Sequence, residues 1–143
     1  MTVQMILSRK GTTVFTVEPS ATIGHAAKFL AEHGIGALLV SGTEDRTIGI
    51  ISERDIVRAI SNHGAAALDT PVSEVMTRKV VSCSKQDKLV DIMQQMTEGH
   101  FRHMPVLEDG HLVGIISIGD VVKRRIEQIE QESNQLREYI RSA

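Results

Sequence analysis

A short phrase occurs twice in this chain of 143 residues, as GIISERD at 49–55 and as GIISIGD at 114–120. Gly-Ile-Ile is typical of a buried strand, and Ser-x-x-Asp is typical of a helix start. One copy would predict only a capped helix, in which the serine and the aspartate form a capping box and the negative charge of the aspartate interacts favourably with the helix dipole. Two copies indicate a duplication, which constrains the fold of the whole chain.

The remaining apolar pattern follows the same duplication. Apolar residues recur at helical spacing in both copies, at Ile23, Ala26, Ala27 and Leu30 and again at Leu89, Ile92, Met93 and Met96. Short β-branched or apolar runs also coincide and predict strands at 14–17 and 80–83, 37–40 and 103–106, and 48–51 and 113–116. A polar turn is expected at 41–47, and the first helix that follows Ser-x-x-Asp is expected to end near Gly64 in a left-handed conformation.

Each copy therefore predicts a β-α-β-β-α unit, and the chain an α/β (α+β) fold. The predicted organisation is a first repeat at 1–66, a second at 67–127 and a C-terminal helical extension at 128–143. A unit of about 60 residues buries so little surface that it is only marginally stable alone. We expect the two repeats to share a core, with two small sheets packed about a pseudo-twofold axis and helices outside.

Composition limits the class of partner. The net charge is −2 with both signs interspersed, so we expect no nucleic-acid partner. No apolar run is long enough to span a bilayer, and residues 1–20 lack a signal-peptide core, so no membrane partner is expected. The single cysteine, Cys83, cannot form an internal disulfide and favours a reducing, cytoplasmic location.

The two phrases, together with EVMT at 74–77 and HFRHMPVLEDG at 100–110, resemble a pair of cystathionine-β-synthase (CBS) domains. The resemblance covers residues 3–127 and implies a small stand-alone CBS-domain protein. Such a protein is expected to be a regulatory module that senses AMP, ADP, ATP, NAD(H) or S-adenosylmethionine in two clefts between the repeats. It is expected to signal to a partner protein whose identity the sequence does not give.

Residue chemistry agrees with that expectation. A carboxylate on the first helical turn accepts hydrogen bonds from ribose hydroxyls, and a helix start offers N–H groups to phosphate. Capping and ligand binding are compatible roles for the same serine and aspartate. The resemblance implies that one cleft combines Ser52 and Asp55 with Val81, Arg102, His103 and Met104, and that the other combines Ser117 and Asp120 with Phe15, Ile35, Gly36 and Ala37.

The cleft that contains Arg102 and His103 is expected to hold the nucleotide phosphate more tightly than the other. Arg102 and His103 stand where the family often places phosphate-binding groups, and an arginine donates two hydrogen bonds while staying charged. The alternative for Arg102 is a solvated turn charge. At the other cleft Lys10 and Thr13 precede the first strand, where they either reach a ligand phosphate or form a polar linker.

No residues predict catalysis or a metal site. The six histidines lack a paired zinc spacing, and Cys83 aligns with Val17 as a small buried residue. We therefore predict a protein that is not an enzyme, with no catalytic cofactor. Two alternatives are a structural dimerisation adaptor with vestigial clefts, which the intact Ser and Asp in both repeats disfavour, and a small enzyme that would have only His103 and Cys83 as candidate groups.

The end of the chain predicts one long helix. Apolar or small residues recur at spacings of four and three, at Val122, Ile126, Ile129, Ser133, Leu136 and Ile140. The stripe either packs back on its own domain or supports assembly. Because CBS pairs usually dimerise through their helices, a homodimer is expected.

Overall fold

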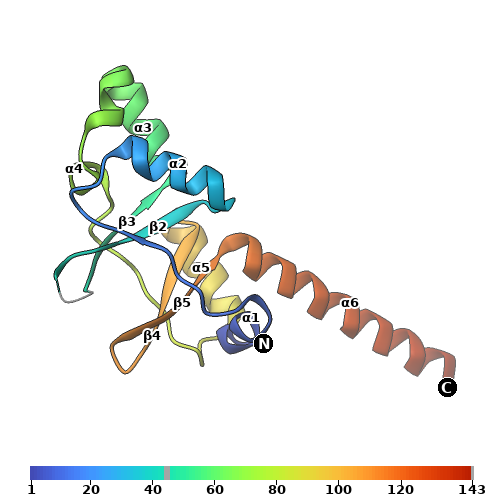
Figure 1. Ribbon diagram of the computed structural model, residues 1–143. Coiled ribbons are helices and arrows are strands. Elements are labelled where there is room, and N and C mark those ends of the chain that lie inside the picture. Colours follow the sequence, from blue (N-terminus) through green and yellow to red (C-terminus); the bar gives the residue numbers. More distant parts are fainter. Residues whose placement is uncertain (44–45, 143) are drawn as a thin grey trace. The chain divides into compact units, whose positions relative to one another are not determined.

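The computed structural model describes residues 1–43 and 46–142, and it divides into two compact units (Figure 1). The continuous unit is residues 14–80, and the split unit joins residues 1–13 to residues 81–143. The predicted repeats divide the sequence differently, at 1–66 and 67–127. In the structure residues 1–13 pack with residues 81–143, and residues 67–80 pack with the first repeat.

The continuous unit is a three-stranded sheet with helices packed on it. Its elements, in chain order, are β1 (Thr16–Val17), α2 (Ile23–His33), β2 (Ala37–Ser41), β3 (Thr47–Ser52), α3 (Glu53–His63), the 3₁₀ helix η2 (Gly64–Asp69) and α4 (Val72–Val75). The strand order is β1-β2-β3, with β1 parallel and β3 antiparallel to β2. Leu38, Val40 and Ile51 from the sheet are fully buried with Ile23 of α2 and Val72 of α4.

The split unit repeats this plan with one strand fewer. Its elements are α1 (Val3–Lys10), α5 (Leu89–Gly99), β4 (His103–Glu108), β5 (His111–Ser117) and α6 (Ile118–Ser142). Strands β4 and β5 form an antiparallel pair. Their core is aliphatic, with Ile6 of α1, Ile92 of α5, and Met104 and Ile116 of the strands at most 1 % exposed.

The predicted strand at 80–83 is wrong, and a proline accounts for it. Only Cys83 bridges β4, donating its N–H to the Pro105 carbonyl at 3.0 Å and accepting from the Leu107 N–H at 2.8 Å. The next rung would need an N–H from residue 105, which proline lacks. In the continuous unit the equivalent residue is Leu39, whose N–H donates to the Phe15 carbonyl at 3.4 Å.

The strand registers confirm the duplication residue by residue. Ala37 lies opposite Ser52 in the first hairpin, and His103 lies opposite Ser117 in the second. Both hairpins have a register irregularity at the same place, directly after Val40 and directly after Val106. Each Ser-x-x-Asp phrase therefore leaves its sheet at the same position.

The predicted helical faces are confirmed. The first, second and fourth of the four apolar positions are buried in α2, at Ile23, Ala26 and Leu30, and equally in α5, at Leu89, Ile92 and Met96. Helix α3 ends before Gly64 as expected, but Gly64 has φ 68 and ψ −157, a positive φ outside the left-handed helical region. The predicted turn at 41–47 includes residues 44 and 45, which lie outside the described residues.

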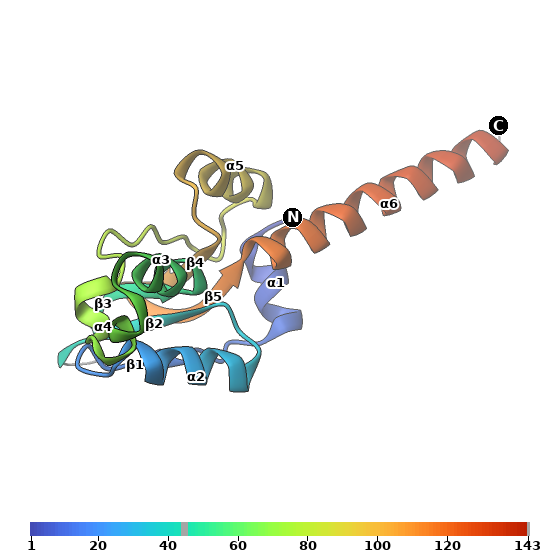
Figure 2. The same ribbon diagram turned by 90° about the horizontal axis from the view of Figure 1, so that it is seen from above.

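The C-terminal segment is helical, as predicted. Helix α6 runs without interruption from the second Ser-x-x-Asp phrase to Ser142, and Ala143 lies outside the described residues. Figure 2 shows it as one long helix seen from a second direction. Among the helices of the described ranges, none is both long and apolar enough to cross a membrane.

Candidate functional site

The first Ser-x-x-Asp phrase forms a closed corner between β3 and α3. Ser52 is the helix N-cap in an extended conformation, and its Oγ accepts a hydrogen bond from the Asp55 N–H at 3.3 Å. Asp55 Oδ2 accepts in return from the Ser52 N–H at 2.9 Å and from the Ser52 hydroxyl at 3.0 Å. The capping box is therefore present, and it holds the Asp55 carboxylate in one orientation. Only 8 % of Asp55 is exposed, and these hydrogen bonds satisfy the buried carboxylate.

A threonine from the segment after α4 completes this corner. Thr77 Oγ1 lies 3.4 Å from Asp55 Oδ1, at the long end of a hydrogen bond. The threonine is held in place by its backbone, which exchanges hydrogen bonds with Ile50 of β3 at 2.8 and 2.9 Å. Asp55 thus accepts from hydroxyl and backbone donors.

The second phrase forms the same corner between β5 and α6. Asp120 Oδ2 accepts from the Ser117 N–H at 2.9 Å, and Ser117 Oγ accepts from the Asp120 N–H at 3.1 Å. The difference lies in the partner from outside the phrase. Lys10, the last residue of α1, donates from Nζ to Asp120 Oδ2 at 2.7 Å and to the Ile115 carbonyl at 3.0 Å.

The lysine changes the charge of the second corner. Burial by itself raises the pKa of the Asp120 carboxyl, but the Lys10 hydrogen bond, the Ser117 N–H and the positive charge of Lys10 together lower the pKa below its usual value. Asp120 is therefore a carboxylate at neutral pH, with its charge balanced by a cation. Its side chain remains 26 % exposed.

The segments that bring in Thr77 and Lys10 are themselves a repeat that the sequence analysis missed. VQMILSRK at 3–10 resembles VSEVMTRK at 72–79. Equivalent residues dock in the same way, since the Val3 N–H donates to the Asp87 carbonyl and the Val72 N–H donates to the Ala21 carbonyl. The signal was the shared Ser/Thr-Arg-Lys ending, which is too short to stand out without the structure.

Two glycines allow these segments to lie against the strands. A Cβ on Gly49 of β3 would stand 2.6 Å from Met76 Sδ and 3.0 Å from the Thr77 carbonyl oxygen. A Cβ on the equivalent Gly114 of β5 would stand 2.7 Å from Leu7 Cδ2. At Gly49 the Thr77 carbonyl is backbone and limits the space for a side chain, whereas at Gly114 the nearest atoms belong to the flexible Leu7 side chain.

Four further candidate residues lie at one edge of the continuous unit. Gly36 accepts at its carbonyl from the Glu53 N–H at 3.0 Å, which ties the start of β2 to the start of α3. Ala37 is buried, whereas Ile35 is half-buried. Phe15 is 36 % exposed, and its ring packs against Phe29 at 5.5 Å and His33 at 4.7 Å between centroids.

The other candidates lie in the split unit with Asp120 and Lys10. Met104 is fully buried and Val81 is 38 % exposed. Arg102 is exposed and His103 half-buried at the start of β4, and the Arg102 carbonyl accepts from the Ile118 N–H at 2.8 Å. Thr13 is exposed. Because Ser52 and Asp55 belong to the other unit, their grouping with Val81, Arg102, His103 and Met104 stays a prediction, as does the grouping of Asp120 with Phe15.

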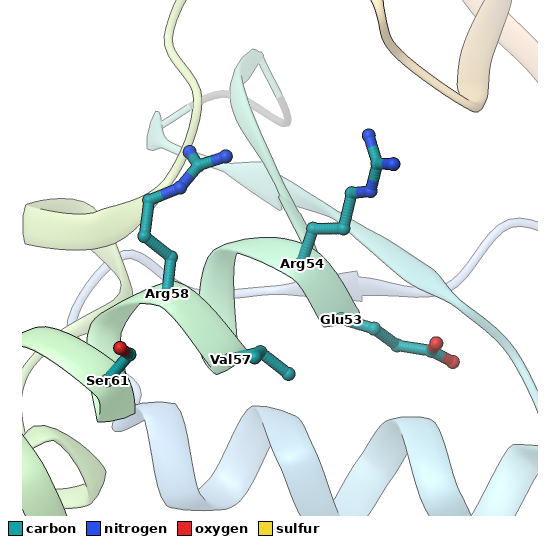
Figure 3. A pocket seen from close by; sticks show the side chains of 5 residues that line it. All are labelled: Glu53, Arg54, Val57, Arg58 and Ser61. Atoms are coloured by element: carbon teal, nitrogen blue, oxygen red, sulfur yellow. The ribbon is translucent and has the colours of Figure 1, made fainter.

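Sequence reasoning also missed a surface groove along α3. It has a volume of 470 Å³ and is lined by Glu53, Arg54, Val57, Arg58 and Ser61 (Figure 3). The side chains of Arg54 and Arg58 extend to the same side of the helix, one turn apart. Glu53 and Arg54 are the two variable residues of the first phrase, so this groove borders the corner that contains Asp55.

The one cysteine of the chain is a poor candidate for a reactive centre. Burial, and secondarily the charge of Asp87, raise the pKa of the Cys83 thiol to about 12, which disfavours the nucleophilic thiolate. Within residues 1–43 and 46–142, no three His, Cys, Asp or Glu side chains are grouped to hold a metal ion.

Comparison with known proteins matches the whole repeated region. The family model described as "CBS domain" matches residues 9–62 and 72–127. An uncharacterised 17.7 kDa protein of Acidianus ambivalens is 40 % identical over 113 residues, which is 78 % of this chain and 67 % of that protein. The chain spans 60 % and 21 % of the lengths of two further relatives, both CBS-domain-containing proteins of Arabidopsis thaliana.

Solved structures share the fold over most of the chain. A CBS-domain-containing protein of Agrobacterium tumefaciens is 48 % identical with a TM-score of 0.86, over 87 % of this chain and 99 % of that one. A CBS-domain protein of Pyrobaculum aerophilum complexed with AMP is 25 % identical with a TM-score of 0.74, over 84 % and 89 %. A CBS-domain pair in complex with 5′-methylthioadenosine and S-adenosyl-L-methionine is also 25 % identical, with a TM-score of 0.76, over 86 % and 98 %.

Proposed function

Because this chain belongs to the CBS-domain family, we propose that it is a regulatory module that binds an adenosine nucleotide and passes the signal to a partner protein. The ligand class is AMP, ADP, ATP, NAD(H) or S-adenosylmethionine. The related pairs solved with AMP and with S-adenosylmethionine support an adenosine-containing ligand.

The observation that carries the proposal is the pair of matching Ser-x-x-Asp corners. In each corner one carboxylate oxygen, Oδ2, is occupied by the start of its own helix. The capping bonds fix the carboxylate before any ligand arrives, so that Asp55 and Asp120 are oriented to accept from ribose hydroxyls. Ordering a carboxylate in advance lowers the entropic cost of binding.

Phosphate recognition differs between the two proposed sites. At the site of Asp55 we assign it to Arg102 and His103, with Val81 and Met104 as apolar walls. At the site of Asp120 we assign it to Lys10, with Thr13 nearby and with Phe15, Ile35, Gly36 and Ala37 as walls. Support for Lys10 is its position on Asp120, which places a cation beside the carboxylate that would hold the ribose.

The proposed role is regulatory and not catalytic. The corners offer fixed acceptors and cations, which suit binding, and the pKa of Cys83 disfavours its use as a nucleophile. A homodimer in the cytoplasm is part of the proposal, supported by the apolar stripe of α6 and by a single buried cysteine. The second candidate function is a dimerisation adaptor that binds no ligand.

A thermal-shift panel separates these two functions. The purified chain would be heated with AMP, ADP, ATP, NAD, NADH, S-adenosylmethionine or adenosine. A ligand that binds only the folded state stabilises it by about 2.7 kcal/mol at one hundred times its Kd, and this stabilisation raises the melting temperature. At least one of the adenosine ligands is expected to raise it. If none does at millimolar concentration, the adaptor function replaces the sensor.

A further inference from the structure

The last part of α6 presents an apolar stripe that its own unit does not cover. Helix α6 contacts α1, α5 and β5 near its start, where Val121 is fully buried. From Ile129 to Ser142 every residue is exposed. The stripe includes Ile129 at 54 %, Leu136 at 60 % and Ile140 at 65 % exposed. The sequence left open a helix packed back on its own domain, and these exposures disagree with that alternative for residues 129–142.

The stripe has the spacing of a two-stranded coiled coil. In heptad terms Ile126, Ser133 and Ile140 occupy a positions, and Val122, Ile129 and Leu136 occupy d positions. Ser133 is the one polar residue in this seam. A single polar a residue lowers stability but specifies register. The seam therefore favours one register with a partner helix.

The flanking charges fit a second copy of the same helix in parallel. In a parallel, in-register pair, a g residue faces the e residue five positions later on the partner. Arg125 then faces the partner's Glu130, and Glu132 faces the partner's Arg137. Both contacts join opposite charges, and each occurs twice in the symmetric pair.

Antiparallel pairing of the same stripe gives the opposite result. With the a and d layers matched, residue numbers that face each other across the seam sum to about 262, and g faces g while e faces e. Glu130 then meets the partner's Glu130, and Glu132 meets the partner's Glu132. Lys123 meets the partner's Arg137. Three contacts between like charges disfavour this direction.

We propose that residues 122–140 of α6 pair in parallel and in register with the same segment of a second copy of this chain. The seam has fewer than three heptads, so it acts together with other contacts between the copies. The inference depends on the helix and its charges, and it stands whether or not the chain binds a nucleotide.

A cysteine placed at the end of the seam tests the direction. In the full-length chain, Ile140→Cys brings two thiols together only if the helices are parallel, because antiparallel pairing separates them by about 27 Å. The matched control is Glu138→Cys, at an f position on the opposite face of the same turn. Wild type serves as a second control, since Cys83 is buried and its thiol has a pKa raised to about 12.

Under mild oxidation, Ile140→Cys is expected to give a covalent dimer at least tenfold faster than Glu138→Cys. Adding Arg137→Glu to Ile140→Cys should raise the dimer dissociation constant in sedimentation roughly tenfold, because two attractive contacts become repulsive. Adding Glu132→Arg to that variant should restore it. Equal cross-linking of the two cysteine variants, a monomeric wild type at tens of micromolar, or no rescue by the charge swap would overturn the proposal.

Discussion

The two Ser-x-x-Asp corners share their local geometry and differ in what reaches them from elsewhere in the chain. Each has a serine cap and a carboxylate that accepts a hydrogen bond from the serine N–H at 2.9 Å. Each also contacts a docked segment, residues 72–79 at Asp55 and residues 3–10 at Asp120. At Asp55 the docked segment supplies the hydroxyl of Thr77, at 3.4 Å. At Asp120 it supplies the ammonium of Lys10, at 2.7 Å.

Duplicated motifs therefore need not give duplicated sites. Asp55 accepts from a neutral hydroxyl, whereas Asp120 accepts from an ammonium that balances its charge. We infer that an anionic nucleotide approaching Asp120 meets less repulsion from that carboxylate than it would without Lys10. We infer that the two sites, if both bind, differ in their dependence on ligand charge.

The docked segments have the same Ser/Thr-Arg-Lys ending, but the threonine contacts Asp55 in one unit and the lysine contacts Asp120 in the other. The Ile50 carbonyl accepts from the Thr77 backbone N–H, and the equivalent Ile115 carbonyl accepts from the Lys10 side chain. The first segment thus pairs its backbone with β3, and the second segment contacts the equivalent carbonyl of β5 through the lysine at the end of α1. A substitution at either segment should alter one corner and spare the other.

The largest expected effect comes from removing one carboxylate. Asp55→Ala should weaken AMP binding at its site by roughly 2–4 kcal/mol, since two hydrogen bonds to a charged acceptor are lost. Two-site calorimetry measures it, with Asp120→Ala as the matched change in the other unit. Each substitution also removes half of a capping box, which costs about 1 kcal/mol of stability.

Asp55→Asn is the control for that loss, because it keeps the shape and one acceptor oxygen while removing the charge. An intermediate affinity is expected. If Asp55→Ala leaves both binding steps unchanged although the protein is less stable, Asp55 is only a helix cap. The two corners would then differ in their contribution to folding and not in ligand binding.

A smaller effect separates the cations of the two sites. In an Asp55→Ala background, where only the site of Asp120 binds, Lys10→Met should lower AMP affinity about three- to tenfold and leave adenosine affinity nearly unchanged. In an Asp120→Ala background, Arg102→Ala should do the same at the other site. Titrations at two salt concentrations check both, because screening weakens the charged contact.

The reverse pattern would reject the assignments. If Arg102→Ala lowers AMP affinity equally in both backgrounds, the arginine acts on the general charge of the molecule and does not clamp one phosphate. If Lys10→Met strengthens adenosine binding, the lysine competes with the ribose for Asp120 instead of assisting the ligand.

The smallest effect is a pH dependence of stability. The pKa of Asp120 is lowered in the folded protein, so its carboxylate contributes stability above the unfolded pKa of about 4, and this contribution is lost as the pH falls through the folded value. Lys10→Met should move the Asp120 pKa towards its ordinary value and reduce this loss by about 0.5 kcal/mol or less, because the pair is partly exposed.

Carboxyl NMR titration of wild type and Lys10→Met measures the pKa directly, and urea unfolding at pH 6 and pH 3 measures the stability. Glu127 lies on the same helix, α6, and pairs with Arg9 at 3.2 Å and also with Arg124, so Arg9→Met is a control that removes a cation of α1 without touching Asp120. An Asp120 titration that does not respond to Lys10→Met would mean that the lysine leaves the carboxylate in solution.

Features that depend on neighbouring residues could be predicted before the structure was known. Apolar spacing placed α2 and α5 and their buried faces, because a helix repeats every 3.6 residues whatever surrounds it. Ser52 with Asp55, and Ser117 with Asp120, specified two capping boxes, since the bonded atoms lie within three residues. The duplication itself was readable in GIISERD and GIISIGD, and so was the uninterrupted helix at the end of the chain.

Contacts between segments that are distant in the sequence could not be predicted and are seen only in the folded chain. Lys10 reaches Asp120 across 110 residues, and Thr77 reaches Asp55 across 22, and no local pattern gives those contacts. The predicted strand at 80–83 failed because Pro105 on another strand lacks an N–H, a fact that matters only once the two are paired. Neighbouring residues specify the same corner twice, and the docked segments give Asp55 a hydroxyl partner and Asp120 an ion pair.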